Sequence, residues 1–331
     1  MHPLSRYLRI VDGTASPQYL VARSVEVELP SSQGKQWEEH DEAMERARSL
    51  INETNSPVSP SLMDLKASLA RPHMNSCSLC PWRCGAARSS GQGRCGVTRP
   101  RLASSFLHMG EEAPLVPSYT IFFAGCNLDC AFCQNYGFSN MPARGTEWSE
   151  EELSRHLDEA VRSGRGIKNI NWVGGDPVPA LPYVLEVLCM MDANIAQIWN
   201  SNMYLEEESM RLLDGVIDVY LTDLKFGNDD CARRLCGALD YSSVVRQNHM
   251  IAASQGEVLV RHLQLPDHLE CCTLPLLNWM AENLPGVALN LMDQYRPAYR
   301  ANEHPELRRG LIREEHLAAL EYARDNGLFL I

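Results

Sequence analysis

The chain has 331 residues, of which 45% are hydrophobic, and a formal net charge of −12. This length allows one domain of about 220 residues with smaller additions, no apolar run approaches the ~20 residues that cross a bilayer, and the negative charge argues against broad binding of a nucleic-acid backbone. Twelve cysteines, with no apolar secretion signal in the first ten residues, indicate a reducing, cytoplasmic compartment in which thiols bind metal.

Residues 1–72 are expected to form an N-terminal extension that packs against the rest of the chain. A weak alternation of apolar residues predicts a strand at 19–29. Helices are predicted at 37–52 and 62–69, separated by the Pro- and Ser-rich segment 55–60. The extension shows no catalytic constellation.

Residues 73–114 form a segment rich in cysteine and glycine. Its four cysteines, Cys77, Cys80, Cys84 and Cys95, fall within 19 residues and can close around one metal. Tetrahedral zinc is the simplest interpretation, although the second C-x2-C pair of many zinc sites is missing. A second iron–sulfur cluster is the alternative, and free thiols are the remaining one.

From residue 115 onward the pattern changes to alternating strands and helices. Six strands are predicted, at 119–124, 167–173, 195–200, 216–222, 257–265 and 287–292. Helices are predicted at 149–162, 181–191, 206–213, 241–253, 274–284 and 313–326. Six βα units in series favour an α/β fold with a parallel sheet and right-handed crossovers.

Three cysteines follow the first of these strands with the spacing C-x3-C-x2-C, at Cys126, Cys130 and Cys133. Thiolates gathered on one loop bind soft metals and iron–sulfur clusters. A cubane cluster has four irons, so three protein ligands leave one iron open for chemistry. The alternatives are three buried thiols or part of a zinc site, which normally has four ligands.

The second strand ends in Gly174, Gly175 and Asp176, where a parallel barrel would place a ligand. Two glycines let the backbone approach a ligand closely and leave N–H and C=O groups free to bind it. By itself, such a string is also an ordinary turn.

Polar residues stand on the following strands as well. Asn202 follows the third strand, and Asp223 and Lys225 follow the fourth. Arg261 lies within the apolar fifth strand and needs a partner, because an unpaired buried charge is costly. His262 would point to the opposite face from Arg261 and is interpreted as structural.

The cysteine loop resembles the defining motif of the radical S-adenosylmethionine (SAM) superfamily, including the aromatic Phe132 before the last cysteine. The resemblance implies an open, partial (β/α)6 barrel over residues 115–331. It also implies a [4Fe-4S] cluster on Cys126, Cys130 and Cys133, with SAM bound at the open iron.

Other strand ends extend this resemblance. The string 174–177 resembles the superfamily's Gly-Gly-Glu-Pro motif, which holds the SAM amino group, with Asp in place of the commoner Glu. The string 223–225 matches an Asp-Leu-Lys string of glycyl-radical-enzyme activases, and residues 201–202 match their Thr-Asn-Gly string in part. The resemblance therefore implies a SAM pocket shaped by Gly174, Gly175, Asp176, Asn202, Asp223, Lys225 and Arg261.

From about residue 76 to its end, the chain resembles proteins similar to pyruvate formate-lyase activating enzyme, in a branch with an N-terminal cysteine motif. The resemblance implies a radical SAM oxidoreductase that makes a 5′-deoxyadenosyl radical and activates a glycyl-radical partner enzyme. The alternatives are modification of another protein side chain or a small molecule, and a non-enzymatic iron–sulfur or zinc protein. Reduced flavodoxin or ferredoxin is the implied reductant.

Four further cysteines lie late in the chain, at Cys231, Cys236, Cys271 and Cys272. Because adjacent cysteines seldom ligate one metal easily, we interpret them mostly as structural or surface thiols.

Overall fold

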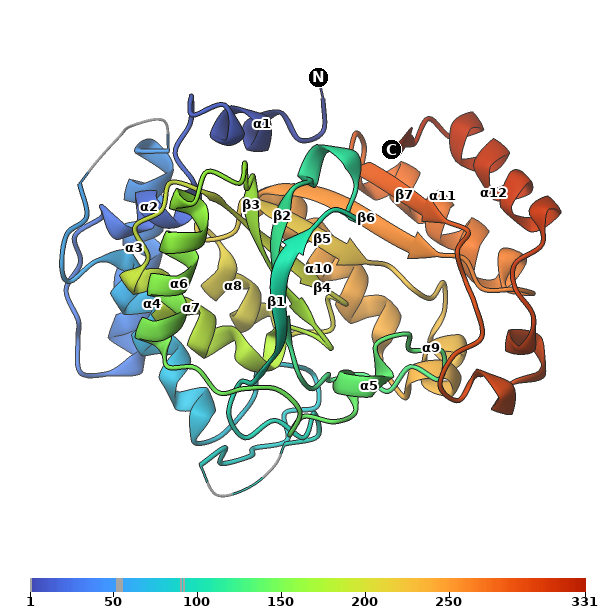
Figure 1. Ribbon diagram of the computed structural model, residues 1–331, viewed down its shortest axis with the longest axis horizontal. Coiled ribbons are helices and arrows are strands. Elements are labelled where there is room, and N and C mark those ends of the chain that lie inside the picture. The colour runs from blue at the N-terminus through green and yellow to red at the C-terminus, as the bar shows by residue number, and fades with distance from the viewer. Residues whose placement is uncertain (1, 52–55, 90, 92) are drawn as a thin grey trace.

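The computed structural model describes residues 2–51, 56–89, 91 and 93–331. These residues form one sheet of eight strands whose spatial order follows the chain order (Figure 1). β1 is antiparallel to β2, and β2 to β8 are parallel neighbours. The strands are β1 (Leu102–His108), β2 (Ser118–Phe123), β3 (Asn169–Gly174), β4 (Ala196–Ser201), β5 (Val219–Asp223), β6 (Glu257–Leu263), β7 (Ala288–Met292) and β8 (Phe329–Leu330). The six predicted strands are β2–β7, so the expected partial barrel is confirmed.

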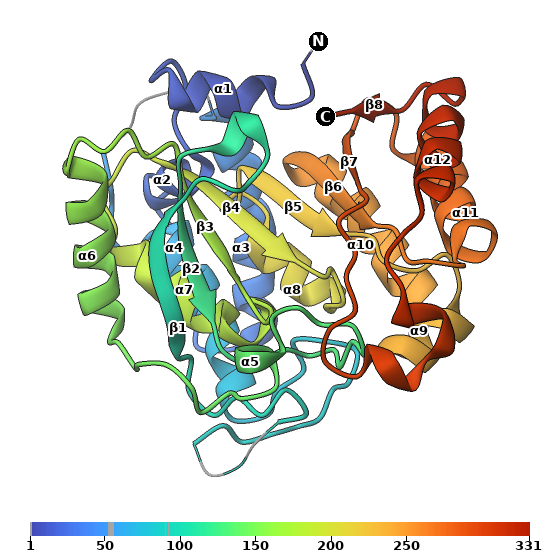
Figure 2. The same ribbon diagram turned by 45° about the vertical axis from the view of Figure 1, so that its right-hand side comes forward.

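Helices cover the outer face of this curved sheet (Figures 1 and 2). The helices of the described residues, including those at the ends of the sheet, are α1 (Ser5–Val11), α2 (Gln18–Arg23), α3 (Gln33–Ser49), α4 (Leu62–Ala70), α5 (Tyr136–Ser139), α6 (Glu150–Arg162), α7 (Leu181–Met190), α8 (Glu207–Leu213), α9 (Asp229–Cys236), α10 (Tyr241–Gln255), α11 (Leu274–Asn283) and α12 (Arg313–Asp325). None of these described helices combines the length and the apolar character needed to cross a membrane.

The barrel wall has two faces because side chains alternate along each strand. On β3, Ile170 and Trp172 point outward into the core beneath the helices, whereas Asn169 and Asn171 point inward. Other inward positions carry apolar side chains, most of them small or β-branched. They are Ala196, Ile198, Val219, Leu221, Leu259 and Ala288.

Helix α1 closes the end of the barrel at which the parallel strands begin. Its Tyr7 and Ile10 are buried in one cluster with the inward-facing residues of β4–β7. The carboxylate of Glu257 accepts hydrogen bonds from the N–H groups of Arg6 (2.6 Å) and Tyr7 (2.7 Å), which have no partner within the helix. Arg6 Nη1 lies 2.8 Å from Asp218 Oδ1. Figure 1 shows α1 at the opposite end of the sheet from α5.

The predicted strand at residues 19–29 is wrong. Residues Gln18–Arg23 form α2, whose Tyr19, Val21 and Ala22 are buried. The chain becomes extended only after this helix, where Glu26 makes an isolated antiparallel bridge with Ser61. A strand needs a paired neighbour to be stable, and this segment packs on helices instead. The predicted helix end at Asn52 lies outside the described residues.

We expect Arg6→Ala to lower the free energy of unfolding by about 3 kcal/mol, because it leaves the buried Asp218 carboxylate without its counter-charge. Two backbone donors, the N–H groups of Gln18 and Gln197, still bind that carboxylate, which keeps the loss at the lower end of the usual range. Urea denaturation measures the difference. Arg9→Ala, on an exposed position of the same helix, is the matched control and should change little. Equal stability of the two variants would contradict the expectation.

Candidate active site

The predicted metal loop lies at the other end of the barrel, where the parallel strands terminate. It joins β2 to α5 and starts at Gly125, whose φ of +92° suits glycine. Cys126, Cys130 and Cys133 all line one cavity of about 420 Å³. This volume lies within the range of small-molecule sites in proteins. The single loop therefore brings its three sulfur atoms to one space.

The surroundings of these thiols favour their neutral form until a metal binds. Burial raises the pKa of Cys126 well above its usual value and also raises that of Cys133. A hydrogen bond with Cys236, followed by burial, raises the pKa of Cys130. Cys236 is thus a neighbour of the loop that sequence reasoning did not connect with it. Metal binding at such thiols releases protons.

The spacing of the three sulfur atoms distinguishes between kinds of metal site. A single zinc ion holds its thiolates about 3.8 Å apart, because Zn–S bonds of ~2.3 Å point to the corners of a tetrahedron. In the part of the chain that the structure describes, these cysteines are not among the groups whose ligand atoms all lie within 4.8 Å of one another. At least one pair of these sulfur atoms therefore lies more than 4.8 Å apart, which is wider than the spacing of two thiolates on one zinc ion.

The two glycines after β3 bring this turn into close contact with the cysteine loop. A Cβ at Gly174 would lie 2.1 Å from Phe123 O, and one at Gly175 would lie 2.1 Å from Gly125 O. The N–H groups of Gly175 and Asp176 donate to those same two carbonyls, at 2.9 and 3.0 Å. The expectation of free backbone groups at the two glycines is therefore wrong for the N–H of Gly175, because this N–H and that of Asp176 fasten the turn to the loop.

Asp176 connects the glycine turn to the end of β4. Its buried carboxylate accepts hydrogen bonds from the N–H groups of Val178 (3.0 Å) and Asn202 (2.8 Å) and from Ser201 Oγ. Burial raises the pKa of Asp176 to about 6. Asn202 in turn donates to Asn127 Oδ1 at 2.8 Å. Both predicted residues line the cavity beside the cysteines.

Asp223 and Lys225 line the same cavity from the end of β5. Lys225 Nζ lies 2.5 Å from Asp223 Oδ2. Burial disfavours the ammonium, but Asp223 and the nearby Cys130 outweigh it and raise the pKa of Lys225 above its ordinary value. The strand end therefore presents an ion pair to the cavity.

Arg261 also lines the cavity, and two carboxylates that sequence reasoning missed are its partners. Its guanidinium donates to both oxygens of Glu112, at 2.8 and 2.7 Å, and to Glu111. Asn290 Nδ2 donates to Glu112 as well, at 2.7 Å. The side chains of Glu111 and Glu112 are almost fully buried. The neighbouring His262 points away, and its Nδ1 donates a hydrogen bond to Leu224 O at 2.7 Å.

Comparison with known proteins identifies this arrangement. The model of the family described as "Radical SAM superfamily" matches residues 120–275, which run from β2 past the end of β6. "Uncharacterized protein MJ0674" of Methanocaldococcus jannaschii is 39% identical, over 99% of both chains. The chain therefore carries a radical SAM superfamily domain over residues 120–275.

Solved structures with a similar fold have low sequence identity to this radical SAM chain. Methylornithine synthase (PylB) is 14% identical, with a TM-score of 0.47 over 98% of this chain and 78% of that one. SuiB of Streptococcus suis is 15% identical, with a TM-score of 0.41 over 64% of this chain and 47% of that one. The match therefore spans about half of SuiB.

The segment with the second predicted metal site lies next to the loop of Cys126, Cys130 and Cys133. Cys77, Cys80, Cys84 and Cys95 line one small cavity together with Arg88 and Asn127. Arg88 Nη2 lies 3.1 Å from Cys77 Sγ, and Trp82 Nε1 donates to Asn127 O at 2.7 Å. The structure thus brings the four predicted cysteines together next to the residue that follows Cys126.

Proposed function

We propose that this chain is an enzyme that reductively cleaves SAM at a [4Fe-4S] cluster held by Cys126, Cys130 and Cys133. The observation that carries the proposal is that three thiols of one loop open into a cavity lined by charged groups from four other strand ends. When bound, such a cluster supplies the electron that splits SAM into methionine and a 5′-deoxyadenosyl radical, which removes hydrogen from a substrate.

The residues of the cavity are suited to hold a molecule with the charges of SAM. SAM carries a sulfonium, an ammonium and a carboxylate. We assign the two cations to the side lined by Gly174, Gly175, Asp176 and Asn202, because the Asp176 carboxylate supplies the opposite charge. Asp223 and Lys225 offer a pair of opposite charges to the remaining polar groups. Arg261 sets the shape of the far wall through Glu111 and Glu112.

The test is anaerobic incubation of the reconstituted chain with SAM and dithionite, or with reduced flavodoxin or ferredoxin, followed by measurement of 5′-deoxyadenosine. Formation of 5′-deoxyadenosine in amounts exceeding the enzyme would support the proposal. A reconstituted, iron-loaded chain that leaves SAM intact would make it a non-enzymatic iron–sulfur protein instead.

For the substrate, the match of residues 223–225 to the activases favours a glycyl-radical partner enzyme. Modification of another protein side chain or of a small molecule is the competing proposal. Deuterated candidates separate the two, because the radical carries deuterium from the true substrate into 5′-deoxyadenosine. Deuterium transfer from the glycine of a partner enzyme would establish the activase. Transfer from a small molecule alone would exclude it.

We also propose that Cys77, Cys80, Cys84 and Cys95 bind a metal of their own. Arg88 places a positive charge beside Cys77, which would favour a thiolate there, and tetrahedral zinc and an iron–sulfur cluster are the two candidate occupants. We expect a variant with Cys126, Cys130 and Cys133 replaced by alanine to retain a metal after anaerobic reconstitution with iron, sulfide and zinc, and retained iron with sulfide would indicate a second cluster. Zinc without iron would indicate a zinc site, and neither metal would mean ordinary thiols.

A further inference from the structure

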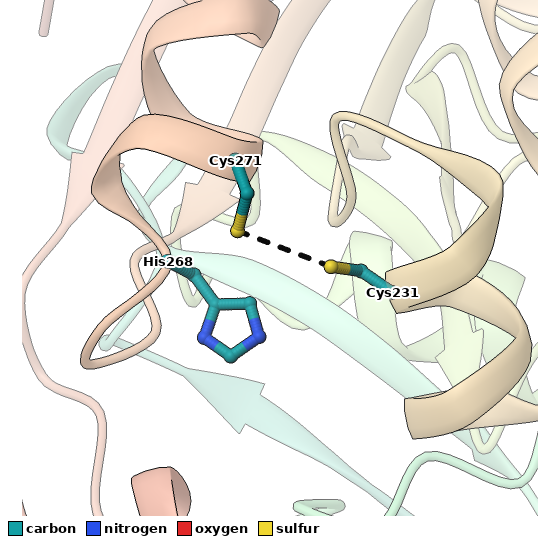
Figure 3. Close-up of side chains that lie close together, drawn as sticks. All are labelled: Cys231, His268 and Cys271. Carbon is teal, nitrogen blue, oxygen red and sulfur yellow. Dashed lines mark hydrogen bonds between the residues drawn. The ribbon is translucent and has the colours of Figure 1, made fainter.

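A third group of metal-binding side chains lies outside both cysteine segments. The ligand atoms of Cys231, His268 and Cys271 all lie within 4.8 Å of one another. The two sulfur atoms are 3.9 Å apart (Figure 3). That distance is close to the ~3.8 Å between thiolates on one tetrahedral zinc ion. The side chains thus already stand at the spacing of a mononuclear site.

The histidine of this group is held as a metal-binding histidine usually is. His268 is buried, and its Nδ1 lies 2.9 Å from Pro266 O. A carbonyl can only accept, so Nδ1 carries the proton and Nε2 keeps its lone pair. Figure 3 shows the ring with one nitrogen turned toward Cys231 and the other turned away. A backbone carbonyl that orients the imidazole is the common partner behind a metal ligand.

Two separate chain segments supply the ligands. Cys231 lies in the first turn of α9, where its N–H is capped by Asn228 Oδ1 at 2.8 Å. Cys271 lies in a π-helical turn, Leu269–Thr273, that follows β6, and His268 directly precedes this turn. In this turn the N–H groups of Cys272 and Thr273 both reach His268 O, at 3.0 Å. Such turns are rare and often occur at functional sites.

The two segments are locked together at the backbone. Gly227, which precedes α9, lies so close to the π-helical turn that a Cβ there would be 2.7 Å from Cys272 Cα. Asn228 Nδ2 also donates to Cys271 O at 2.8 Å. The distance between the ligands is therefore set by packed backbone and does not depend on flexible side chains alone.

The charges around the group fit two thiolates. Arg234 Nη2 donates to His268 Nε2 at 3.3 Å, a hydrogen bond that a metal at Nε2 would replace, and Arg234 also pairs with Glu306. Its cation compensates negative charge that the two sulfur atoms would carry on binding metal. Cys271 is exposed, so the fourth position of a tetrahedral ion faces solvent. A Cys2His set with one position left for water is a known zinc arrangement.

We propose that Cys231, His268 and Cys271 bind one thiophilic divalent cation, with Zn²⁺ as the natural occupant. The ion would tie the first turn of α9 to the turn after β6. Backbone carbonyls in the last turn of α9 accept hydrogen bonds from the loop of Cys126–Cys133. Ala131 N donates to Leu235 O (2.7 Å), and Asp129 N donates to Cys236 O (3.2 Å). The ion therefore anchors the helix against which the loop of Cys126–Cys133 is held.

Metal analysis of the full-length chain tests this proposal without any activity assay. Wild type, Cys271→Ser, His268→Gln and the control Cys189→Ser are reconstituted anaerobically with iron and sulfide, equilibrated with Zn²⁺ and desalted. We expect Cys271→Ser and His268→Gln each to lose one zinc equivalent per chain, and Cys189→Ser to lose none. Cys271 is exposed, so its replacement by serine should leave the fold intact. Equal zinc in all four proteins would overturn the proposal.

Co²⁺ offers an independent readout of the ligands. Cobalt bound by thiolates gives an intense sulfur-to-metal charge-transfer band, which should weaken in Cys271→Ser and stay unchanged in Cys189→Ser. The alternative to metal binding at this sulfur–sulfur distance is a disulfide. Thiol mapping of the anaerobically purified wild type distinguishes the two. A Cys231–Cys271 disulfide in that protein would overturn the metal site, whereas two thiols that zinc protects from alkylation would support it.

Discussion

Replacing Cys126, Cys130 and Cys133 by alanine is expected to abolish reductive cleavage of SAM. The three thiols of the β2–α5 loop are the only protein ligands that we assign to the catalytic cluster. Without them no thiol of this loop would remain to hold iron beside the cavity that the three cysteines line. Cleavage should fall to the background of dithionite and SAM without enzyme, measured as 5′-deoxyadenosine by chromatography.

Each single alanine variant should cause nearly the same loss, because a cluster with two protein ligands has lost its fixed orientation. Cys189→Ala is the matched control, since this half-buried thiol belongs to α7. It should retain both iron and activity. Persistent cleavage in the triple variant would place the catalytic cluster elsewhere, and the cysteines at 77–95 would be the first residues to examine.

Arg261→Ala should lower the free energy of unfolding by about 3–5 kcal/mol, the usual cost of breaking a buried ion pair. The change leaves Glu111 and Glu112 buried without the guanidinium that now binds both. SAM affinity should also fall, because Glu111 and Glu112 lose the guanidinium through which Arg261 shapes the far wall of the cavity. Urea denaturation and equilibrium binding measure the two effects.

The pH dependence of this variant follows from the same charges. Arg261 lowers the pKa of Glu112 against the opposing effect of burial. Without Arg261, burial raises the pKa of Glu112, so the folded protein binds a proton there more readily than the unfolded chain does. The stability deficit should therefore be largest at neutral pH and shrink as the pH falls.

A neutral triple variant is the control that isolates unpaired charge as the cause. Arg261→Met combined with Glu111→Gln and Glu112→Gln removes all three charges while keeping side chains of similar size. It should recover much of the stability lost in Arg261→Ala. If the triple variant is as unstable as the single one, lost packing rather than charge explains the deficit.

The features that sequence predicted well are those encoded locally. Short apolar runs between helical stretches predicted β2–β7, because a strand that is buried needs apolar side chains on both of its faces. The cysteine loop was also predictable, because its three ligands lie within eight residues of one another. The strand ends were informative for the same reason, since Asp176, Asn202, Asp223 and Lys225 lie at or just after the ends of their own strands.

The missed features depend on contacts between distant segments. Arg261 was expected to need a partner, but nothing near it in the chain points to Glu111 and Glu112, which precede it by about 150 residues. The pairing of Cys231 with Cys271 depends on the π-helical turn, which has no sequence signature as clear as a strand's. Helix α2 was mistaken for a strand because its apolar spacing fits both periods.

The position of α1 has a consequence for the order in which the molecule is built. This helix is translated before every strand, yet the surface that buries Tyr7 and Ile10 is complete only when β7 has been made. Its contacts therefore have very high sequence separation, which slows folding. During synthesis the apolar side chains of this segment stay uncovered until about residue 292 has left the ribosome. Partly made chains should accordingly be the form most prone to aggregation and most dependent on chaperones.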